Sequence, residues 1–136
     1  MKKTFIFLFV LLIGTSVYSQ TIEYSKNALA TMVTADGILA TTTGVAAGYI
    51  LQNGDIQNAA HVTIGHILNN GHIQNATNAD VGFVLGNGNV QDAQHNYVGK
   101  VNDDGTILNE LGNTFGNAPG INKSWAAVCF FFYKVN

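Results

Sequence analysis

Four histidines are the side chains of this sequence best suited to metal binding or acid–base chemistry: His61, His66, His72 and His95. His66 and His72 flank one Asn-Gly turn, which places them on the outer face of a predicted hairpin as a close diagonal pair. Two imidazoles can share a metal ion, but a protein zinc site needs about three or four ligands and a second shell that orients them. We therefore interpret the pair as a surface feature and predict no metal ligands.

The chain repeats itself every 17 residues, and the other repeats do not carry this histidine pair. The positions that match His66 hold Tyr49, Phe83 and Lys100, and those that match His72 hold Asp55, Asn89 and Thr106. His61 and His95 occupy one loop position two repeats apart, since 95 − 61 = 34. We interpret them as a duplicated loop residue with a solvated side chain.

Carboxylates form no converging set in the sequence. Asp103 and Asp104 are adjacent in one turn, whereas calcium takes about six to eight oxygen ligands, and turn chemistry already explains Asx before Gly. Gly86-Asn87-Gly88 lacks the helix and the Lys-Ser/Thr of a phosphate loop, and no Ser/His/Asp set is visible. The acidic residues available for glycoside hydrolysis share no repeat position: Asp55, Asp80, Asp92 and Glu110. We predict no catalytic residues, no cofactor and no enzyme activity.

A layer of amides is the strongest polar pattern. Each clear repeat carries Gln followed by Asx: Gln57-Asn58, Gln74-Asn75 and Gln91-Asp92. One interpretation is an intramolecular ladder that satisfies backbone groups at strand ends. The other is a polar rim that binds sugars, with Tyr49, Phe83 and Tyr97 stacking nearby. We favour the structural interpretation.

Cys129 is the one cysteine of the chain, so it cannot form an internal disulfide. It lies in an apolar run, where a cysteine is typically a small buried hydrophobic residue. A reactive thiol needs a polar, electropositive setting instead. We predict a buried, unreactive thiol.

The N-terminal residues have the pattern of a bacterial secretory signal peptide. Lys2-Lys3 is the positive start, Phe5–Ile13 the apolar run, and Val17-Tyr18-Ser19 the cleavage site. The run falls well short of the ~20 residues that span a bilayer, and no cysteine follows it to carry a lipid. We predict a signal peptide over residues 1–19, one domain over residues 20–136 without a membrane span, and a periplasmic or extracellular location.

The predicted mature chain is acidic. Without the two leader lysines it has 6 − 2 = 4 lysines and no arginine against 8 acidic residues, a formal charge of 4 − 8 = −4. An acidic chain without a basic cluster argues against nucleic acid and anionic membrane surfaces as partners.

One seven-residue window organises the rest of the sequence. Each copy has an aliphatic residue, two variable residues, Asn or Asp, Gly, one variable residue and a second aliphatic residue. The copies are VTADGIL (33–39), ILQNGDI (50–56), ILNNGHI (67–73), VLGNGNV (84–90) and VNDDGTI (101–107). Asx-Gly between apolar positions is a strong hairpin signal, so five windows predict five hairpins.

Two turn geometries are compatible with the window. A two-residue turn would pair Leu68 with Ile73, whereas a three-residue loop with Gly71 as the left-handed bulge residue pairs Ile67 with Ile73 on one face. The second geometry puts both aliphatic residues of every window on the same side and uses the conformational freedom of glycine. We predict the bulged turn.

Strands fill the repeat between turns. Glycine, asparagine, threonine and β-branched residues dominate and no helical stripe is visible, so we predict no helix.

Residues 20–36 read as a degenerate opening copy, with Ile22 and Val33 at the two aliphatic positions. A second glycine faces inward in each copy and suggests strands that crowd a central axis: Gly48, Gly65, Gly82 and Gly99.

The C-terminal stretch differs from the repeats. Residues 124–135 (SWAAVCFFFYKV) form a continuous apolar run without alternation. Such a run is typical of a strand buried on both faces, and the alternative is an exposed segment that aggregates or forms an interface. We predict a terminal strand that fills the centre of the assembly.

The repeats NGDIQNAAHVTIGHI, NGHIQNATNADVGFV and NGNVQDAQHNYVGKV, followed by WAAVCFFF, resemble the bacterial five-fold β-flower proteins. Those are small exported proteins with tandem hairpin repeats and an aromatic C-terminal run. The resemblance covers residues 20–136, although Asn and Ala stand here where relatives often carry charged residues. It implies a pseudo-fivefold ring of hairpins and no particular activity, so no site residue is carried over.

Together these patterns predict an all-β fold of tandem 17-residue hairpins, closed in a pseudo-fivefold ring with an aromatic C-terminal strand. We expect a non-enzymatic, exported structural or interaction module whose partner is a cell-envelope protein or a glycan. The alternative is a small carbohydrate-binding protein that uses repeated polar and aromatic sites around the ring.

Overall fold

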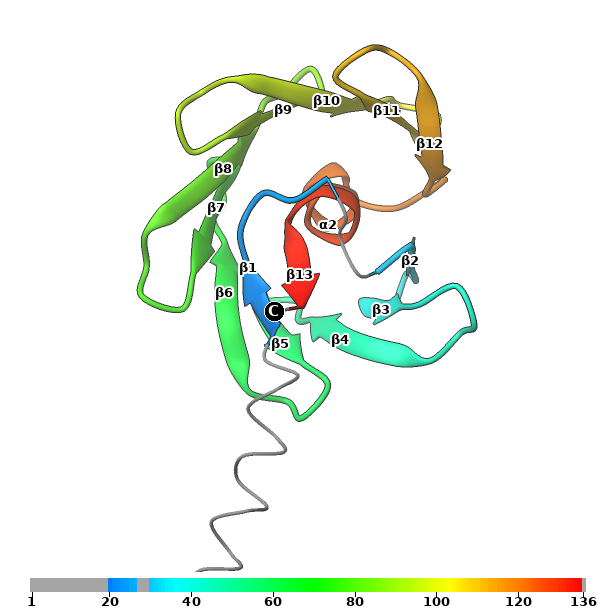
Figure 1. The fold of residues 1–136 in the computed structure, drawn as a ribbon. Helices are drawn as coiled ribbons and strands as arrows, with labels where there is room; N and C mark the ends of the chain where they lie inside the picture. Colours follow the sequence, from blue (N-terminus) through cyan, green and yellow to red (C-terminus); the bar gives the residue numbers. More distant parts are fainter. Residues whose placement is uncertain (1–19, 27–29, 136) are drawn as a thin grey trace, which may run out of the picture.

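Figure 1 shows the computed structural model as a ring of β-hairpins around a central tail. The structure describes residues 20–26 and 30–135. The predicted signal peptide, residues 1–19, lies outside them. Within the described ranges, no helix is long and apolar enough to cross a membrane.

Eleven strands form the ring as one antiparallel sheet, in which each strand pairs with the next along the chain. They are β2 (Met32–Val33), β3 (Ile38–Ala40), β4 (Ala46–Ile50), β5 (Asp55–Asn58), β6 (Thr63–Ile67), β7 (His72–Asn75), β8 (Asp80–Val84), β9 (Asn89–Asp92), β10 (Tyr97–Val101), β11 (Thr106–Asn109) and β12 (Thr114–Asn117). The predicted all-β, pseudo-fivefold hairpin fold is confirmed.

The five Asx-Gly windows form bulged turns, as predicted. Ile67 pairs with Ile73 across the turn between β6 and β7, and the other four windows have the same register. The Gly71 N–H donates to the Leu68 carbonyl at 3.1 Å, and the five turn glycines have φ between +88° and +96°. We call these the inner turns: Gly37, Gly54, Gly71, Gly88 and Gly105, each with its two preceding residues.

A second set of five loops joins the hairpins at their outer tips, which project from the ring like petals (Figure 1). The loop after β5 is closed by a hydrogen bond from the His61 N–H to the Asn58 carbonyl at 2.9 Å. Each outer loop has one residue with a positive φ near its C-terminal end: Gly44, His61, Asn78, His95 and Gly112. The loop position predicted for His61 and His95 is confirmed.

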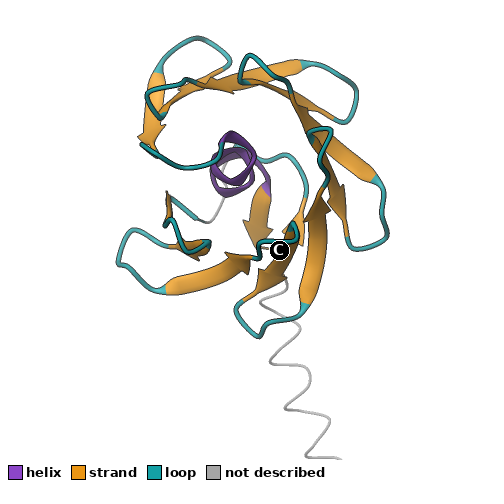
Figure 2. Cartoon of the chain, turned by 180° about the vertical axis from the view of Figure 1, so that it is seen from behind, coloured by secondary structure: helices purple, strands orange, loops and turns teal. Residues whose placement is uncertain are grey.

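The C-terminal stretch is mainly helical, so the prediction of no helix is wrong there, and the predicted terminal strand is limited to its last residues. It comprises α2 (Lys123–Ala127), a π-helix η1 (Val128–Phe132) and only a short strand, β13 (Tyr133–Val135). We call residues 122–135 the plug. Its position is as predicted: it fills the centre of the ring (Figures 1 and 2), and Phe132 and Tyr133 are fully buried.

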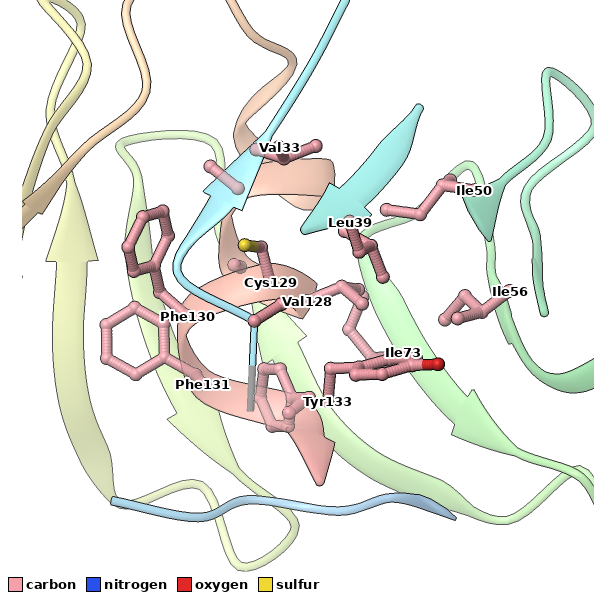
Figure 3. Packing of buried hydrophobic residues seen from close by; sticks show 14 of the residues in the cluster. Val33, Leu39, Ile50, Ile56, Ile73, Val128, Cys129, Phe130, Phe131 and Tyr133 are labelled. Carbon is pink, nitrogen blue, oxygen red and sulfur yellow. The ribbon is translucent and has the colours of Figure 1, made fainter. Parts of the chain in front are cut away.

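The inward glycines of the strands make room for side chains in the centre of the ring, four from the plug and one from β1. A Cβ added at any of them would lie closer than 3.0 Å to a central side chain. The pairs are Gly48 with Tyr133, Gly65 with Ile22, Gly82 with Phe132, Gly99 with Phe131, and Gly116 with Phe130. Figure 3 shows Phe130, Phe131 and Tyr133 leaving the tail toward different parts of the ring. Burying one such aromatic side chain stabilises the fold by roughly 1.5–3 kcal/mol.

The N-terminal strand β1 (Gln20–Ile22) is not part of the ring, which corrects the prediction of an opening repeat over residues 20–36. It lies in the centre and pairs antiparallel with β13, with Ile22 opposite Tyr133. Only Val33 takes its predicted repeat position, opposite Leu39. Because Ile22 fills the one inward glycine that the plug does not reach, both ends of the described chain build the core.

The ring is nearly closed. Among the described strands, β2 pairs only with β3 and β12 only with β11, so a seam separates the two ends of the sheet. The sequence predicts a closed ring, and in the structure its two end strands are not paired with each other. The chain leaves the ring after Asn117 and enters the centre through Ala118-Pro119-Gly120, as the loss of the repeat pattern there indicates.

Candidate functional site

The predicted histidine pair is divided between two carboxylates. His66 Nδ1 lies 3.0 Å from Asp55 Oδ1 on β5, and His72 Nδ1 lies 3.2 Å from Asp80 Oδ2 on β8. Each imidazole thus bonds across its own strand pair. Over residues 20–26 and 30–135, no three His, Cys, Asp or Glu side chains are grouped to hold a metal ion.

Asp80 is the centre of a small polar network on the outer face of β7 and β8. Gln74 Nε2 donates to its Oδ1 at 3.0 Å, and His72 contacts the other oxygen. Hydrogen bonds from Gln74 and His72 lower the pKa of this exposed carboxyl below its usual value. A carboxylate held in its charged form is a poor general acid at neutral pH.

His61 and His95 occupy equivalent outer loops, as predicted, but their rings are not simply solvated. Each stacks on an aromatic side chain: His61 on Tyr49 with ring centroids 4.3 Å apart, and His95 on Phe83 at 4.3 Å. Their Nδ1 atoms lie 3.4 and 3.3 Å from the side-chain oxygens of Gln57 and Gln91. Two matched stacks therefore decorate the outer face, two repeats apart.

The Asx residues of the amide layer close the outer loops. Asn58 Oδ1 accepts hydrogen bonds from the backbone N–H groups of Ala60 at 2.9 Å and Val62 at 3.0 Å. Asn75, Asp92 and Asn109 repeat the pattern with their own loops. The structural interpretation is confirmed for these residues, because their oxygens satisfy the backbone at strand ends.

The paired carboxylates of the last inner turn point to different partners. Asp103 forms an ion pair with Lys123 of the plug at 2.5 Å, and Asp104 Oδ1 accepts from the Thr106 N–H at 2.9 Å. These hydrogen bonds lower the pKa of both carboxyls. One carboxylate therefore anchors the plug and the other caps a turn, which differs from a convergent calcium site.

Cys129 lies in η1 and is fully buried, as predicted. Burial raises the pKa of its thiol from 9.0 to about 12. The thiolate is the nucleophilic form of cysteine, so this side chain has almost no reactive form at neutral pH.

A cavity beside β12, at the seam, is not predicted from the sequence. It measures about 270 Å³ and is walled by Tyr24, Phe115, Phe130 and Phe131. Phe115 precedes the inward Gly116 and corresponds to the buried Val98 one repeat earlier, yet it is 44% exposed because no further hairpin covers β12. The one signal in the sequence that marks this cavity is Phe115, an aromatic residue at a repeat position that is aliphatic in the other copies.

The arrangement of five hairpins, five inward glycines and an aromatic plug agrees with one known family. The model of the family described as 5-fold beta-flower protein matches residues 19–134. The chain belongs to this family. No curated protein and no solved structure shows significant similarity to this beta-flower.

The geometry limits where this beta-flower can bind anything. Side chains of the plug fill the centre of the ring. The surfaces left for ligands and partners include the outer face, the seam, the inner turns and a cavity beside β1 that is bordered by Gln20 and Glu23. On the outer face, His61 and His95 already cover one face of the aromatic rings of Tyr49 and Phe83.

Proposed function

We propose that this beta-flower is a non-enzymatic interaction module that is exported by its N-terminal signal peptide and binds a cell-envelope protein. The support for export is the charged and apolar pattern of residues 1–19. The support for binding without catalysis is the way the candidate side chains are engaged, since each carboxylate and imidazole described above has a structural partner.

The observation that carries the proposal is the seam. β12 is an edge strand whose backbone pairs only with β11 among the described strands. Phe115, a residue of this strand that is 44% exposed, and Leu111, which is 78% exposed on the loop before it, both line the apolar cavity. An unpaired edge next to a pocket for a side chain suits the addition of an extended segment from a partner.

The alternative, sugar binding by the repeated amide and aromatic layer, has weaker support. The Asx oxygens of that layer accept backbone hydrogen bonds. The Phe83 ring stacks on His95 and meets the His72 ring at a right angle. Phe83 is only 7% exposed. Of the three aromatic residues of this layer, Tyr97 is the most exposed, at 44%, and the other two rings are covered by histidines.

Site-specific photo-crosslinking in the cells that export the protein tests the proposal. A crosslinker at Thr114 should trap one defined envelope protein, and Leu111→Asn should reduce this product severalfold without changing stability, because Leu111 is largely exposed. Val62→Asn is the matched control, since Val62 is 56% exposed on another outer loop. Equal loss in both variants, or a crosslinker that traps only other copies of the chain, would contradict the proposal.

Export has its own test. N-terminal sequencing of the protein recovered outside the cytoplasm should give Gln20 as the first residue. Recovery of the uncleaved chain from the cytoplasm alone would contradict this part of the proposal.

A further inference from the structure

A polar cleft follows the inner turns where they face the start of the plug. It consists of two adjoining cavities that are open to solvent, the larger of them shallow, of about 210 and 420 Å³, and they share Asn69, Asn122 and Ser124 as walls. Gln52 and Trp125 border the smaller cavity, and Lys123 borders the larger one. The cleft lies on a different part of the molecule from the seam, because no residue of these cavities lines the apolar one.

The path of the chain into the centre decides which turns contribute. The fifth inner turn is covered, since a Cβ at Gly105 would lie 2.5 Å from the Cα of Pro119. The first turn is approached by the indole ring, with Trp125 Cζ3 3.5 Å from a Cβ at Gly37. Only the second, third and fourth turns are left to form a wall, and their tips carry Gln52-Asn53, Asn69-Asn70 and Gly86-Asn87.

The amides in this wall are oriented by the turns themselves. Asn70 Oδ1 accepts from the His72 N–H at 3.1 Å, and Asn122 Oδ1 accepts from the Ser124 N–H at 2.8 Å. Their oxygens are thus engaged, which leaves the side-chain NH₂ groups as donors. The side chains of Gln52 and Asn69 make no hydrogen bond to another described residue, so both ends of these amides are available.

The cleft is close to neutral. No carboxylate lines either cavity, and the one cation, Lys123, is paired with Asp103 at 2.5 Å. Neutral donors and acceptors beside a half-buried indole suit a ligand that has many hydroxyl groups and an apolar face. Neither an anion nor a cation finds an uncompensated opposite charge here.

We infer that this cleft binds a neutral saccharide, with the amides of Asn69 and its neighbours bonding hydroxyl or carbonyl oxygens and Trp125 contacting the apolar face of a ring. The site is separate from the amide and aromatic layer of the outer face. It also goes beyond the protein–protein role of the seam, so that either can fail while the other stands.

Trp125 is the one tryptophan of the chain, which gives the test a reporter inside the site. Indole fluorescence and ¹⁵N-resolved spectra of the side-chain amides should change on titration of the mature protein with N,N′-diacetylchitobiose or maltose, with dissociation constants in the millimolar range. Asn69→Ala should weaken binding about fivefold, the effect of removing one neutral hydrogen bond. Gln94→Ala removes an amide from an outer loop as the matched control and should leave affinity unchanged.

A blocking variant separates binding from stability. A Cβ at Gly86 would meet no atom within 4 Å, so Gly86→Tyr should fold normally while its ring fills the larger cavity and abolishes binding. Gln94→Tyr adds the same side chain elsewhere and should bind as the parent does. The inference would be overturned by unchanged spectra with both sugars, by equal losses in the two tyrosine variants, or by tighter binding of the anionic digalacturonate.

Discussion

The phenyl ring of Phe132 occupies the space in front of Gly82 that a β-carbon would need. The contact joins the π-helix of the plug to β8, and Phe132 is fully buried there. A strand glycine usually weakens a sheet, so its value here lies in the close approach of the ring to the backbone.

Gly82→Ala should therefore destabilise the protein by about 1–3 kcal/mol, the usual effect of overpacking a core. Its φ is not in the left-handed region, so close contacts with the Phe132 ring and with the Gln91 carbonyl oxygen, and not backbone strain, are the cause. Gly86→Ala is the control, because nothing lies near its Cβ, and should change the free energy of unfolding by less than about 0.5 kcal/mol. Urea denaturation of both variants measures the difference, and equal values would contradict the assignment of Phe132 to this glycine.

The inner turns need glycine for a second reason besides φ. The Gly71 carbonyl accepts from the Val84 N–H at 2.9 Å, and a Cβ on Gly71 would lie closer than 3.0 Å to the Val84 carbonyl oxygen. Gly112 has a similar φ of +86° with nothing within 4 Å. We expect Gly112→Ala to cost about 1 kcal/mol from φ alone, and Gly71→Ala to cost clearly more in the same unfolding experiment. Similar losses would show that φ alone selects glycine at these turns.

The stacking of His95 on Phe83 should stabilise its loop measurably. His95 and Asn78 have nearly equal φ, +69° and +67°, at equivalent positions, so glycine relieves similar backbone strain in both. His95→Gly also loses the ring contact and should be less stable than Asn78→Gly by about 0.5–1.5 kcal/mol. Thermal or urea unfolding of the two variants, each against the parent chain, checks the order. Greater stability of His95→Gly would rule out a stabilising stack.

Stability should decline at alkaline pH. Burial raises the pKa of Cys129 from 9.0 to about 12, so the folded state favours the neutral thiol. The corresponding stability is complete below pH 9.0 and is lost as the pH rises toward 12. Burial also raises the pKa of Tyr133, whose hydroxyl donates to the Ala47 carbonyl at 2.6 Å, and this adds a loss above its ordinary value of 10.0.

Cys129→Ala isolates the thiol contribution. The variant should be less stable at neutral pH because it leaves a small cavity, but its urea midpoint should fall less steeply between pH 9.0 and 10.0 than that of the parent chain. The same slope in both proteins would show that Cys129 does not contribute to the alkaline transition.

The parts of the fold that the sequence predicts are those with local causes. The pairing of Ile67 with Ile73 follows from one glycine and two aliphatic residues within seven positions, and the inward direction of Gly82 follows from strand alternation. The caps of the outer loops depend on Asn58 and its equivalents, a pattern that is also local. The Gln-Asx pattern predicts side chains that satisfy backbone groups at strand ends, and the structure adds that these groups belong to the outer loops.

The helical plug and the cleft depend on distant segments. Phe130, Phe131 and Phe132 face glycines of three successive repeats in reverse order, and a strand, which points side chains in only two directions, cannot do this. An α-helix turns about 100° per residue, and a π-helix turns less because its hydrogen bonds skip a further residue. The rotation per residue of the π-helix is therefore nearer to the angle between neighbouring hairpins in a ring of five. Likewise, the route of residues 118–122 decides which turns border the cleft, and no local pattern encodes that route.

The matching of central side chains to glycines has a consequence for how such a protein can change in length. Open arrays of repeats gain or lose units because each unit contacts only its neighbours. Here Ile22, Phe130, Phe131, Phe132 and Tyr133 provide five radial contacts for five glycines. An inserted unit would face a void, and a deleted one would leave an aromatic ring without a place. The number of petals is therefore matched to Ile22 and the four aromatic side chains of the plug, so a duplication would persist only with a matching change among these central side chains.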